Sequence, residues 1–411
     1  MTVKAPPRRT RTHMTSRPTR SHAAPAVPKR AVNSTPTAFL LLLAVFVVLN
    51  LIGLVMVLSA SSVNALARQG SPYYYFAKQA LWSGLGAVVF VAALRVDYRR
   101  WRHLSLPVLG ISILLLMLVL VPGIGVNANG SSRWLGVGNF GIQPSEFAKL
   151  GMLLFAADLL ARRSKLMDDT RVTLRPVVVV LVIVAGLIML QPNLGTTIVL
   201  ASITFAVLFA AGVPWGPLFG YGGVGVALAG AAALGKDYRR ARLLAYMDPW
   251  KDPLNTGYQT LQSYYSIGSG GWFGVGLGAS RAKWGWLPYA HTDFIFAVIG
   301  EELGLVGALL VVSLFVTLGY LGMLVAVWAK DPFGRLLAVG ITTWFCVQAF
   351  VNIGAVIGVL PVTGVPLPFI SFGGSSLLAT MTAAGILCNV AKQGRSTVTP
   401  RLPAPRTRLR A

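Results

Sequence analysis

An aspartate at the start of an apolar segment is the first residue of this sequence that could carry chemistry. Asp293 lies in LPYAHTDFIFAVIGEELG, residues 287–304, where a polar loop leads directly into an apolar run. A carboxylate at the edge of a membrane helix is costly to desolvate, which favours a functional site. A structural explanation is equally open: Thr292 or Asp293 would be the N-cap of the helix, with the negative charge at its positive end.

A charged pair is the second candidate. Glu146 and Lys149 lie three residues apart in GIQPSEFAKLGMLLF, a spacing that places both side chains on one helix face. Pro144 and Ser145 directly before them are typical of a helix start. The pair is either a self-neutralised ion pair at a helix end or the charged lining of a polar cavity. Arg133, upstream in NGSSRWLG, adds a cation on the same side.

Other polar residues within apolar segments have simpler explanations. Gln348 and Asn352, four residues apart, form a stripe that is more often an interhelical hydrogen bond than a ligand site. Glu301 and Glu302 follow Asp293 by a little over two helical turns. We expect one of them to face the bundle interior and to have a partner there.

A membrane scaffold must position these residues. The chain has 411 residues, of which 55% are hydrophobic and 12% charged, far too apolar for a soluble domain. Apolar runs of about 20 residues, long enough to cross a bilayer as helices, recur along it. We therefore predict an all-α polytopic membrane protein with about ten transmembrane helices and a long extracytoplasmic loop, 235–292, between the seventh and the eighth. The predicted spans are 38–60, 77–95, 104–121, 146–161, 176–190, 195–212, 217–234, 302–326, 336–358 and 374–393.

Much of the net charge of +24 lies in two tails. Residues 1–36 and 394–411 are basic, contain no acid and are rich in Pro, Ser, Thr and Ala, so we expect disordered tails around a core at 37–393. Basic segments beside membrane helices mark the cytoplasmic side, which predicts two cytoplasmic termini and makes nucleic-acid binding an inferior explanation.

The long outer loop is itself basic. Its cations suit an anionic partner such as a pyrophosphate. Long loops can ignore the charge bias, however, so a purely structural explanation is also open. As candidate pyrophosphate ligands we name Arg239, Arg240 and Arg242.

Six stretches, in order, resemble the SEDS family of cell-wall proteins, whose members include FtsW, RodA and SpoVE. MVLSASS, AKWGWLPYAHTDFIF and the basic N-terminal tail are more similar to the division protein FtsW than to the elongation protein RodA. The resemblance covers nearly the whole membrane core. The stretches are MVLSASSV, NGSSRWLG–IQPSEFAKL, QPNLGT, GYQTLQSYYSIGSGGWFGVGLG, LPYAHTDFIFAVIGEELG and LPVTGVPLPFISFGGSS.

The resemblance implies a peptidoglycan glycosyltransferase of the cytoplasmic membrane, working at the division septum. It would polymerise lipid II, an undecaprenyl-pyrophosphate-linked disaccharide pentapeptide, beside a class B penicillin-binding protein and other division proteins. By motif, Asp293 is catalytic, while Arg133, Glu146 and Lys149 bind substrate. Asn193 stands where the family usually has Asp, and an amide neither neutralises Lys149 nor binds a cation as a carboxylate does.

In the implied reaction, an acceptor hydroxyl attacks the donor's anomeric carbon and undecaprenyl pyrophosphate leaves. This needs a base, for which we choose Asp293, and positive charge at the leaving group. Lys149 and the outer loop would supply that charge. A divalent cation, Mg²⁺ or Mn²⁺, held by carboxylate oxygens is an alternative source. Single displacement inverts the anomeric centre.

Two other functions compete with polymerisation. A lipid II flippase would need polar groups at several depths of the bilayer, whereas the acids outside the cytoplasmic side lie toward the outer ends of the spans. A non-catalytic division scaffold predicts that Asp293 is dispensable while the basic tails matter. We rank the polymerase first, the flippase second and the scaffold third.

Overall fold

The computed structural model describes residues 2, 34–128, 131–137, 140–235 and 237–394. The tails expected at 1–36 and 394–411 lie almost entirely outside these residues. Asn33–Val398 form one compact unit.

Ten helices of at least 17 residues build this unit, and each coincides with one predicted span. Seven of them (α1, α2, α3, α6, α10, α11 and α12) are long and apolar enough to cross a membrane, and α5 is a shorter apolar helix. The prediction of a polytopic helical membrane protein is therefore confirmed. The ten helices are α1 (Ser34–Gln69), α2 (Tyr74–Arg95), α3 (Trp101–Leu120), α4 (Pro144–Arg162), α5 (Leu174–Leu190), α6 (Leu194–Ala211), α7 (Trp215–Leu234), α10 (Ile295–Trp328), α11 (Pro332–Val356) and α12 (Gly374–Gln393).

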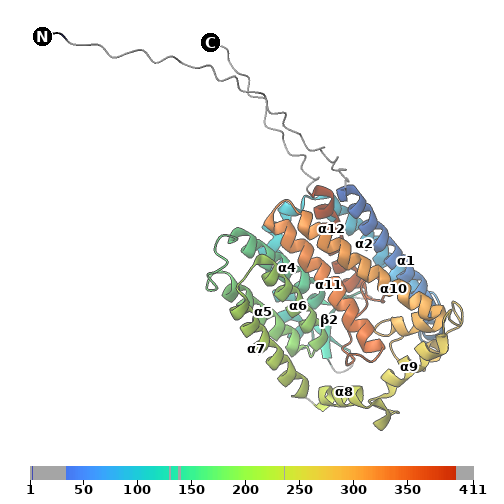
Figure 1. Cartoon of the computed structure of the whole chain (residues 1–411). Helices are drawn as coiled ribbons and strands as arrows, with labels where there is room; N and C mark the ends of the chain where they lie inside the picture. Colours follow the sequence, from blue (N-terminus) through green and yellow to red (C-terminus); the bar gives the residue numbers. More distant parts are fainter. Residues whose placement is uncertain (1, 3–33, 129–130, 138–139, 236, 395–411) are drawn as a thin grey trace, which may run out of the picture. The chain divides into compact units, whose positions relative to one another are not determined.

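The helices run between two ends of the bundle (Figure 1). We call the end where α1 begins and α12 ends the terminal face. The opposite end, which carries the segment between α7 and α10, is the loop face (Figure 1). Asp293, just before α10, and Glu146, in the first turn of α4, both lie toward the loop face.

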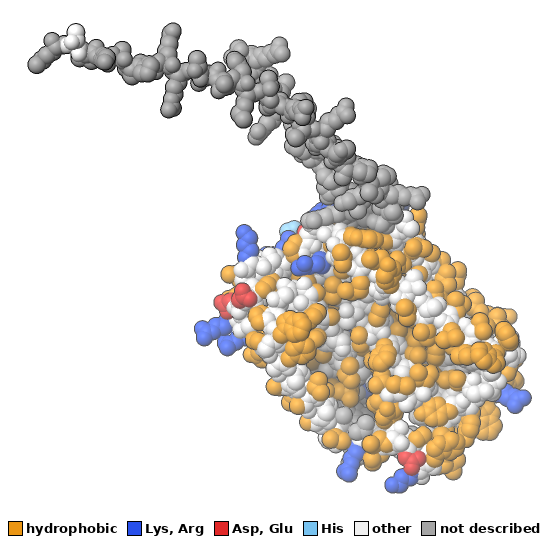
Figure 2. All heavy atoms as spheres, in the orientation of Figure 1, with side chains coloured by type: hydrophobic (Ala, Val, Ile, Leu, Met, Phe, Trp, Pro, Cys, Tyr) orange, Lys and Arg blue, Asp and Glu red, His pale blue; other side chains and the backbone are white. Residues whose placement is uncertain are grey.

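Of the seven candidate spans, α11 and α12 are the most buried. In the most apolar 18-residue stretch of each helix, 83% is buried in α12 and 72% in α11, against 22% in α2. Figure 2 shows hydrophobic side chains over the flank of the bundle, with charged side chains gathered toward its two ends. An apolar flank between charged ends is the surface that a bilayer requires.

A small sheet on the loop face was not predicted. Strands β1 (Gly125–Ala128), β2 (Ser131–Val137) and β3 (Phe140–Ile142) pair antiparallel in the order β1-β2-β3. The middle strand pairs Leu135 with Gly125 on one side and with Ile142 on the other. The Asn-Gly dipeptide at 129–130 is a hairpin signal in the sequence that our search for helices passed over.

The segment between α7 and α10 contains short helices. They are α8 (Asp237–Met247), η2 (Pro249–Lys251), α9 (Tyr258–Gly270) and η3 (Ala282–Trp284). Residues 271–276 of this segment enter a break in α10 at Gly304, which has φ of 68°, a left-handed conformation that favours glycine. There Val275 N–H donates to Glu301 O at 2.9 Å and Leu305 N–H donates to Gly271 O at 2.9 Å.

Glu301 and Glu302 fix the same segment from within the bundle. Glu301 accepts hydrogen bonds from Ser280 Oγ at 2.6 Å and from Arg281 N–H at 2.8 Å. Glu302 accepts from Ser59 Oγ of α1 at 2.6 Å. Both carboxylates are buried, so the expectation of an interior partner is confirmed for each of them.

Candidate active site

Asp293 does not cap a helix. Helix α10 begins at Ile295, and its N-cap position is Phe294, whose side chain makes no capping hydrogen bond. The capping interpretation of Thr292 and Asp293 is therefore wrong, because the chain makes a further turn before the helix starts. Thr292 Oγ1 instead donates to Tyr289 O at 3.2 Å.

The carboxylate of Asp293 faces the last loop, residues 357–373. A β-carbon placed on Gly364 would lie 3.6 Å from Asp293 Oδ2. Backbone contacts join the two segments further along: Ser371 Oγ donates to Thr292 O at 2.6 Å, and Phe372 N–H donates to His291 O at 3.0 Å. The irregular backbone of this loop is thus packed within protein, as membrane depth requires.

Asn352 of α11 holds both segments at once. Its Nδ2 donates to Asp293 O and to Val365 O, each at 2.8 Å. The side chain is buried, with 2% of its residue exposed. Asn352 therefore sets the distance between the backbone of Asp293 and the loop that the carboxylate faces.

The predicted pair Glu146 and Lys149 is present and buried. Pro144 occupies the first turn of α4, as predicted, and Glu146 Oε2 lies 2.9 Å from Lys149 Nζ. The two side chains are only 2% and 1% exposed. Neither is presented to a substrate in this structure.

Gln348 connects this pair to the last loop. Its Oε1 accepts from Lys149 Nζ and from Trp344 Nε1, each at 2.8 Å, and its Nε2 donates to Pro366 O at 2.9 Å. Lys149 Nζ also lies 4.8 Å from the Trp344 ring centroid, a cation–π distance.

One face of α11 therefore joins the predicted site residues. Gln348 contacts Lys149 below the loop, and Asn352, one turn further on, contacts Asp293. The prediction of an interhelical hydrogen-bonding stripe is confirmed. The spacing of four did not reveal that this stripe links Asp293 to the buried pair, because both contacts are between segments far apart in the chain.

Arg133 and Asn193 shape the turn between α5 and α6. Arg133 of β2 donates from Nε to Gln191 O at 2.9 Å and from Nη2 to Pro192 O at 2.6 Å. Asn193 Oδ1 accepts from Thr196 N–H at 3.2 Å as the N-cap of α6. An amide caps a helix as well as a carboxylate does, so Asn193 fills this local role without a charge.

The three arginines that were named as candidate pyrophosphate ligands lie on α8. Arg240 is exposed, whereas the side chains of Arg239 and Arg242 lie outside the described part of the chain. Their contact with a pyrophosphate stays a prediction.

An aromatic cluster that the sequence analysis missed surrounds His291. Its ring centroid lies 4.7 Å from that of Tyr75 and 5.7 Å from that of Phe372. Burial, together with the charge of Arg68, lowers the pKa of His291 to about 4. His291 is therefore neutral at physiological pH and does not place a positive charge beside Asp293.

A metal ion would find few protein ligands here. No group of three or more His, Cys, Asp or Glu side chains comes together within the described residues. Mg²⁺ is commonly held by one or two carboxylates with substrate phosphates and waters. Of the candidate site residues, Asp293 is the carboxylate that would hold such an ion, since Glu146 is already paired with Lys149.

Known proteins resemble the chain over most of its length. A family profile described as a cell cycle protein (FtsW, RodA and SpoVE) matches residues 39–396. A protein of Geobacter metallireducens named probable peptidoglycan glycosyltransferase FtsW is 42% identical over 358 residues, covering 87% of this chain and 96% of the relative. Stage V sporulation protein E of Bacillus subtilis is 41% identical over 356 residues, covering 87% and 97%.

Solved structures agree with this relationship. A structure described as structural coordination of polymerization and crosslinking by a peptidoglycan synthase complex matches with a TM-score of 0.70 and 32% identity, covering 86% of this chain and 97% of that one. The rod shape determining protein RodA of Thermus thermophilus matches with a TM-score of 0.64 and 30% identity, covering 86% and 96%. The chain belongs to the FtsW/RodA/SpoVE family.

Proposed function

We propose that this protein is a peptidoglycan glycosyltransferase that polymerises lipid II, with Asp293 as the base. The observation that supports this role is the position of Asp293. Its carboxylate faces an irregular loop, and its backbone carbonyl accepts a hydrogen bond from Asn352. The names of the relatives support a glycosyltransferase, and the similarity to a chain of a peptidoglycan synthase complex supports work within such a complex.

In this proposal, Asp293 takes the proton from the acceptor hydroxyl as that oxygen attacks the anomeric carbon of the donor. The bond to undecaprenyl pyrophosphate breaks, and the leaving group departs with the electron pair. A positioned general base contributes roughly 10²–10⁴-fold to such a step. Exposed cations of the α7–α10 segment, such as Arg240, stabilise the negative charge that develops on the leaving pyrophosphate.

Glu146 and Lys149 act by position in this proposal. Because their side chains are 2% and 1% exposed, they do not touch the substrate. Lys149 donates a hydrogen bond to Gln348, and Gln348 donates one to Pro366 O in the loop that Asp293 faces. The pair thereby fixes the wall of the site.

The proposed location follows from the charge distribution. Both termini lie in the cytoplasm, so the loop face and Asp293 lie outside, where lipid II is polymerised. The proposed partner is a class B penicillin-binding protein, which would crosslink the new strands at the division septum.

The test is strand synthesis by Asp293→Asn. The full chain is purified with a class B penicillin-binding protein and given labelled lipid II, and glycan strands are resolved on a gel. We expect the rate to fall at least about 10²-fold, with an unchanged thermal melt. Asp248→Asn is the matched control, because Asp248 is an exposed acid of the same outer segment that caps nothing with its side chain.

Three outcomes contradict parts of this proposal. Strand synthesis by Asp293→Asn at the parent rate would show that another group is the base. Lipid II that crosses liposome membranes, with no strands from the parent, would establish the flippase. Normal growth of cells carrying Asp293→Asn would favour the scaffold.

A further inference from the structure

The glycine-rich chain that leaves α9 packs directly on the backbone of α10. A β-carbon placed on Gly270 would lie 1.9 Å from Gly300 O, and one placed on Gly274 would lie 2.1 Å from Glu302 O. Only a residue without a side chain can approach a helix backbone this closely. The large side chains of this loop therefore have no room on the side that faces α10.

Two aromatic side chains of the loop are exposed instead. Trp272 is 70% exposed and Phe273 84%. Their backbone is fixed to the helix, because Val306 N–H donates to Trp272 O at 3.1 Å. Single exposed apolar side chains are normal on a protein surface, whereas adjoining ones on a fixed loop mark an interaction surface. We call residues 271–277 the wedge.

The wedge continues the apolar flank of α10. Beyond the break at Gly304, exposed apolar side chains follow one another along this helix toward the terminal face. They are Leu305, Val306, Leu309, Leu310, Val316, Tyr320, Met323 and Val327. Residues 303–329 contain no charged side chain. Because Trp272 O accepts from the N–H of Val306, the wedge lies against the loop-face end of this apolar stripe.

Helix lengths place the wedge at the edge of the hydrocarbon core. The part of α10 beyond the break, residues 305–328, is about 36 Å long at roughly 1.5 Å per residue. A hydrocarbon core is about 30 Å thick, so the break lies just beyond one side of it. Helix α1 gives the same depth. Ser59, whose Oγ donates to Glu302 at 2.6 Å, lies about 33 Å along α1 from Thr37, where the membrane span of α1 begins.

Tryptophan and phenylalanine are suited to that depth. Tryptophan is enriched where the hydrocarbon meets the polar headgroups, because its ring is apolar and carries one N–H donor. Phenylalanine is common on the apolar face of segments that lie in this layer. The charged residues nearest to the break, Glu301 and Glu302, are only 2% and 1% exposed, so they do not keep the surface of the wedge in water.

We propose that the wedge inserts Trp272 and Phe273 into the interface of the leaflet on the loop face, so that the partner of this surface is the membrane lipid itself. Val275 N–H donates to Glu301 O, and the Glu301 carboxylate accepts from Arg281 N–H. The wedge and the chain that follows it are thus held to one turn of α10. The wedge thereby sets the height of the outer segment above the bilayer, whatever reaction the protein catalyses.

The test measures the depth of the wedge in a bilayer. The full chain, with Cys346 and Cys388 replaced by alanine, carries Phe273→Cys labelled with a nitrobenzoxadiazole fluorophore. It is reconstituted in nanodiscs of phosphatidylethanolamine and phosphatidylglycerol that contain lipids with a nitroxide at a shallow or a deep position of the acyl chain. We expect stronger quenching by the shallow nitroxide, at a depth about 15 Å from the bilayer centre, which is half of a core of about 30 Å. Iodide in the water should quench the label only weakly.

Two further positions calibrate the measurement. Val316→Cys, at a site that is 66% exposed, lies about 16 Å beyond Leu305 along α10, so its label should lie near the bilayer centre. Asp168→Cys, in the exposed turn between α4 and α5, should be quenched by iodide and not by lipid. Trp272→Cys repeats the measurement within the wedge, so that the test stays decisive if Phe273→Cys perturbs the loop.

Three outcomes overturn this inference. Iodide quenching in Phe273→Cys as strong as in Asp168→Cys would place the wedge in water. A label that neither the lipid nitroxides nor iodide can reach would mean that protein covers the surface of the wedge. Loss of lipid quenching when a class B penicillin-binding protein is added would assign this surface to that protein. Strand synthesis is not measured, so each of these outcomes leaves the proposed function untouched.

Discussion

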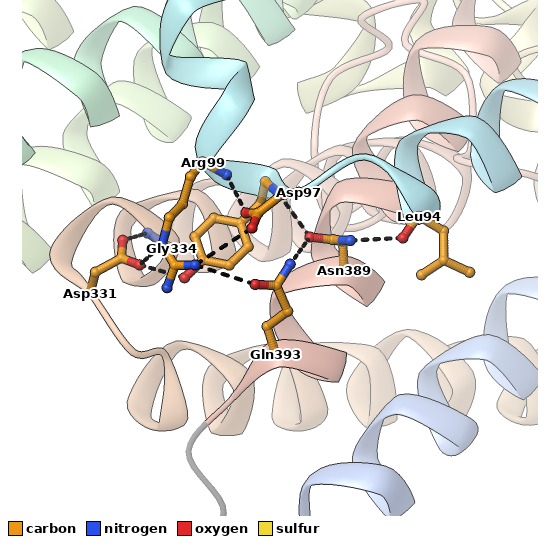
Figure 3. Close-up of polar contacts among 8 residues, drawn as sticks. Leu94, Asp97, Arg99, Asp331, Gly334, Asn389 and Gln393 are labelled. Atoms are coloured by element: carbon orange, nitrogen blue, oxygen red, sulfur yellow. Dashed lines mark hydrogen bonds and ion pairs between the residues drawn. The ribbon is translucent and has the colours of Figure 1, made fainter.

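At the terminal face Asp331 joins η1 (Tyr98–Arg100) to the start of α11 through partly exposed charges, whereas at the loop face Glu146 and Lys149 form a pair buried from solvent. Arg99 Nε lies 3.1 Å from Asp331 Oδ2, and these side chains are 46% and 29% exposed. Tyr98 OH donates to the same carboxylate, and Gly334 N–H donates to its other oxygen at 3.0 Å (Figure 3).

Amides complete the terminal-face cluster. Asn389 Oδ1 accepts from Tyr98 N–H at 2.9 Å and from Gln393 Nε2 at 2.8 Å, while its Nδ2 donates to Leu94 O at 2.7 Å (Figure 3). The cluster therefore fastens the α2–α3 turn to the start of α11 and the end of α12. Each of these contacts connects neighbouring segments of the bundle, so a role in stabilising the fold accounts for the cluster.

Stability does not explain the loop face in the same way. A buried ion pair often contributes no more than apolar residues of the same volume, because two charges lose their water. Beside it, the buried atoms Ser145 Oγ, Asn352 Oδ1 and Thr363 Oγ1 have no hydrogen-bond partner within the described residues. Unpartnered buried polar atoms cost free energy, and each needs an explanation. The comparison teaches that the exposure of a charged pair separates anchors from candidate site residues.

The largest effect that would test this comparison is expected for Lys149→Met. It leaves the Glu146 carboxylate buried without its cation, which costs roughly 3–5 kcal/mol of unfolding free energy. The double variant Glu146→Gln/Lys149→Met should recover most of this stability but not strand synthesis. Denaturant unfolding in micelles and the lipid II gel assay measure the two quantities. Full activity of the double variant would remove the pair from the site.

A smaller effect is expected for Gln348→Leu, which separates Lys149 from the last loop. It removes the hydrogen bonds to the Trp344 N–H and Pro366 O groups, at about 1 kcal/mol each, and should lower strand synthesis more than the loss of stability accounts for. Thr342→Val is the matched control, since Thr342 is buried in the same helix and its Oγ1 has no partner within the described chain. Equal loss of activity in both variants would mean that α11 acts only as a support.

The smallest effect is expected at the terminal face for Tyr98→Phe. The substitution removes one hydrogen bond to Asp331 and should cost about 1 kcal/mol of stability. Strand synthesis per folded molecule should not change, because the cluster lies at the opposite end from Asp293. A thermal melt measures the change in stability, and the gel assay measures strand synthesis. A loss of turnover without a loss of stability would show that the two faces are coupled.

Local patterns predicted much of this molecule. Each apolar run became one helix, since length and hydropathy decide which segments can cross a bilayer. The spacing of Glu146 and Lys149 predicted their contact, because side chains three residues apart share a helix face. The predicted N-cap at Thr292 or Asp293 was wrong, because the start of a helix depends on the turn that precedes it. Here that turn is formed by residues 289–294.

The helices, their order and the contacts within a turn follow from the sequence alone, because they arise from neighbours along the chain. Tertiary structure alone decided that Gln348 contacts Lys149 across 199 positions and that Asn352 contacts Asp293 across 59. It also brought residues of α8 and α9 together with Val362 around a cavity of about 420 Å³. The physical reason is that polar groups within an apolar bundle must find partners, and helix packing decides which distant ones lie within reach.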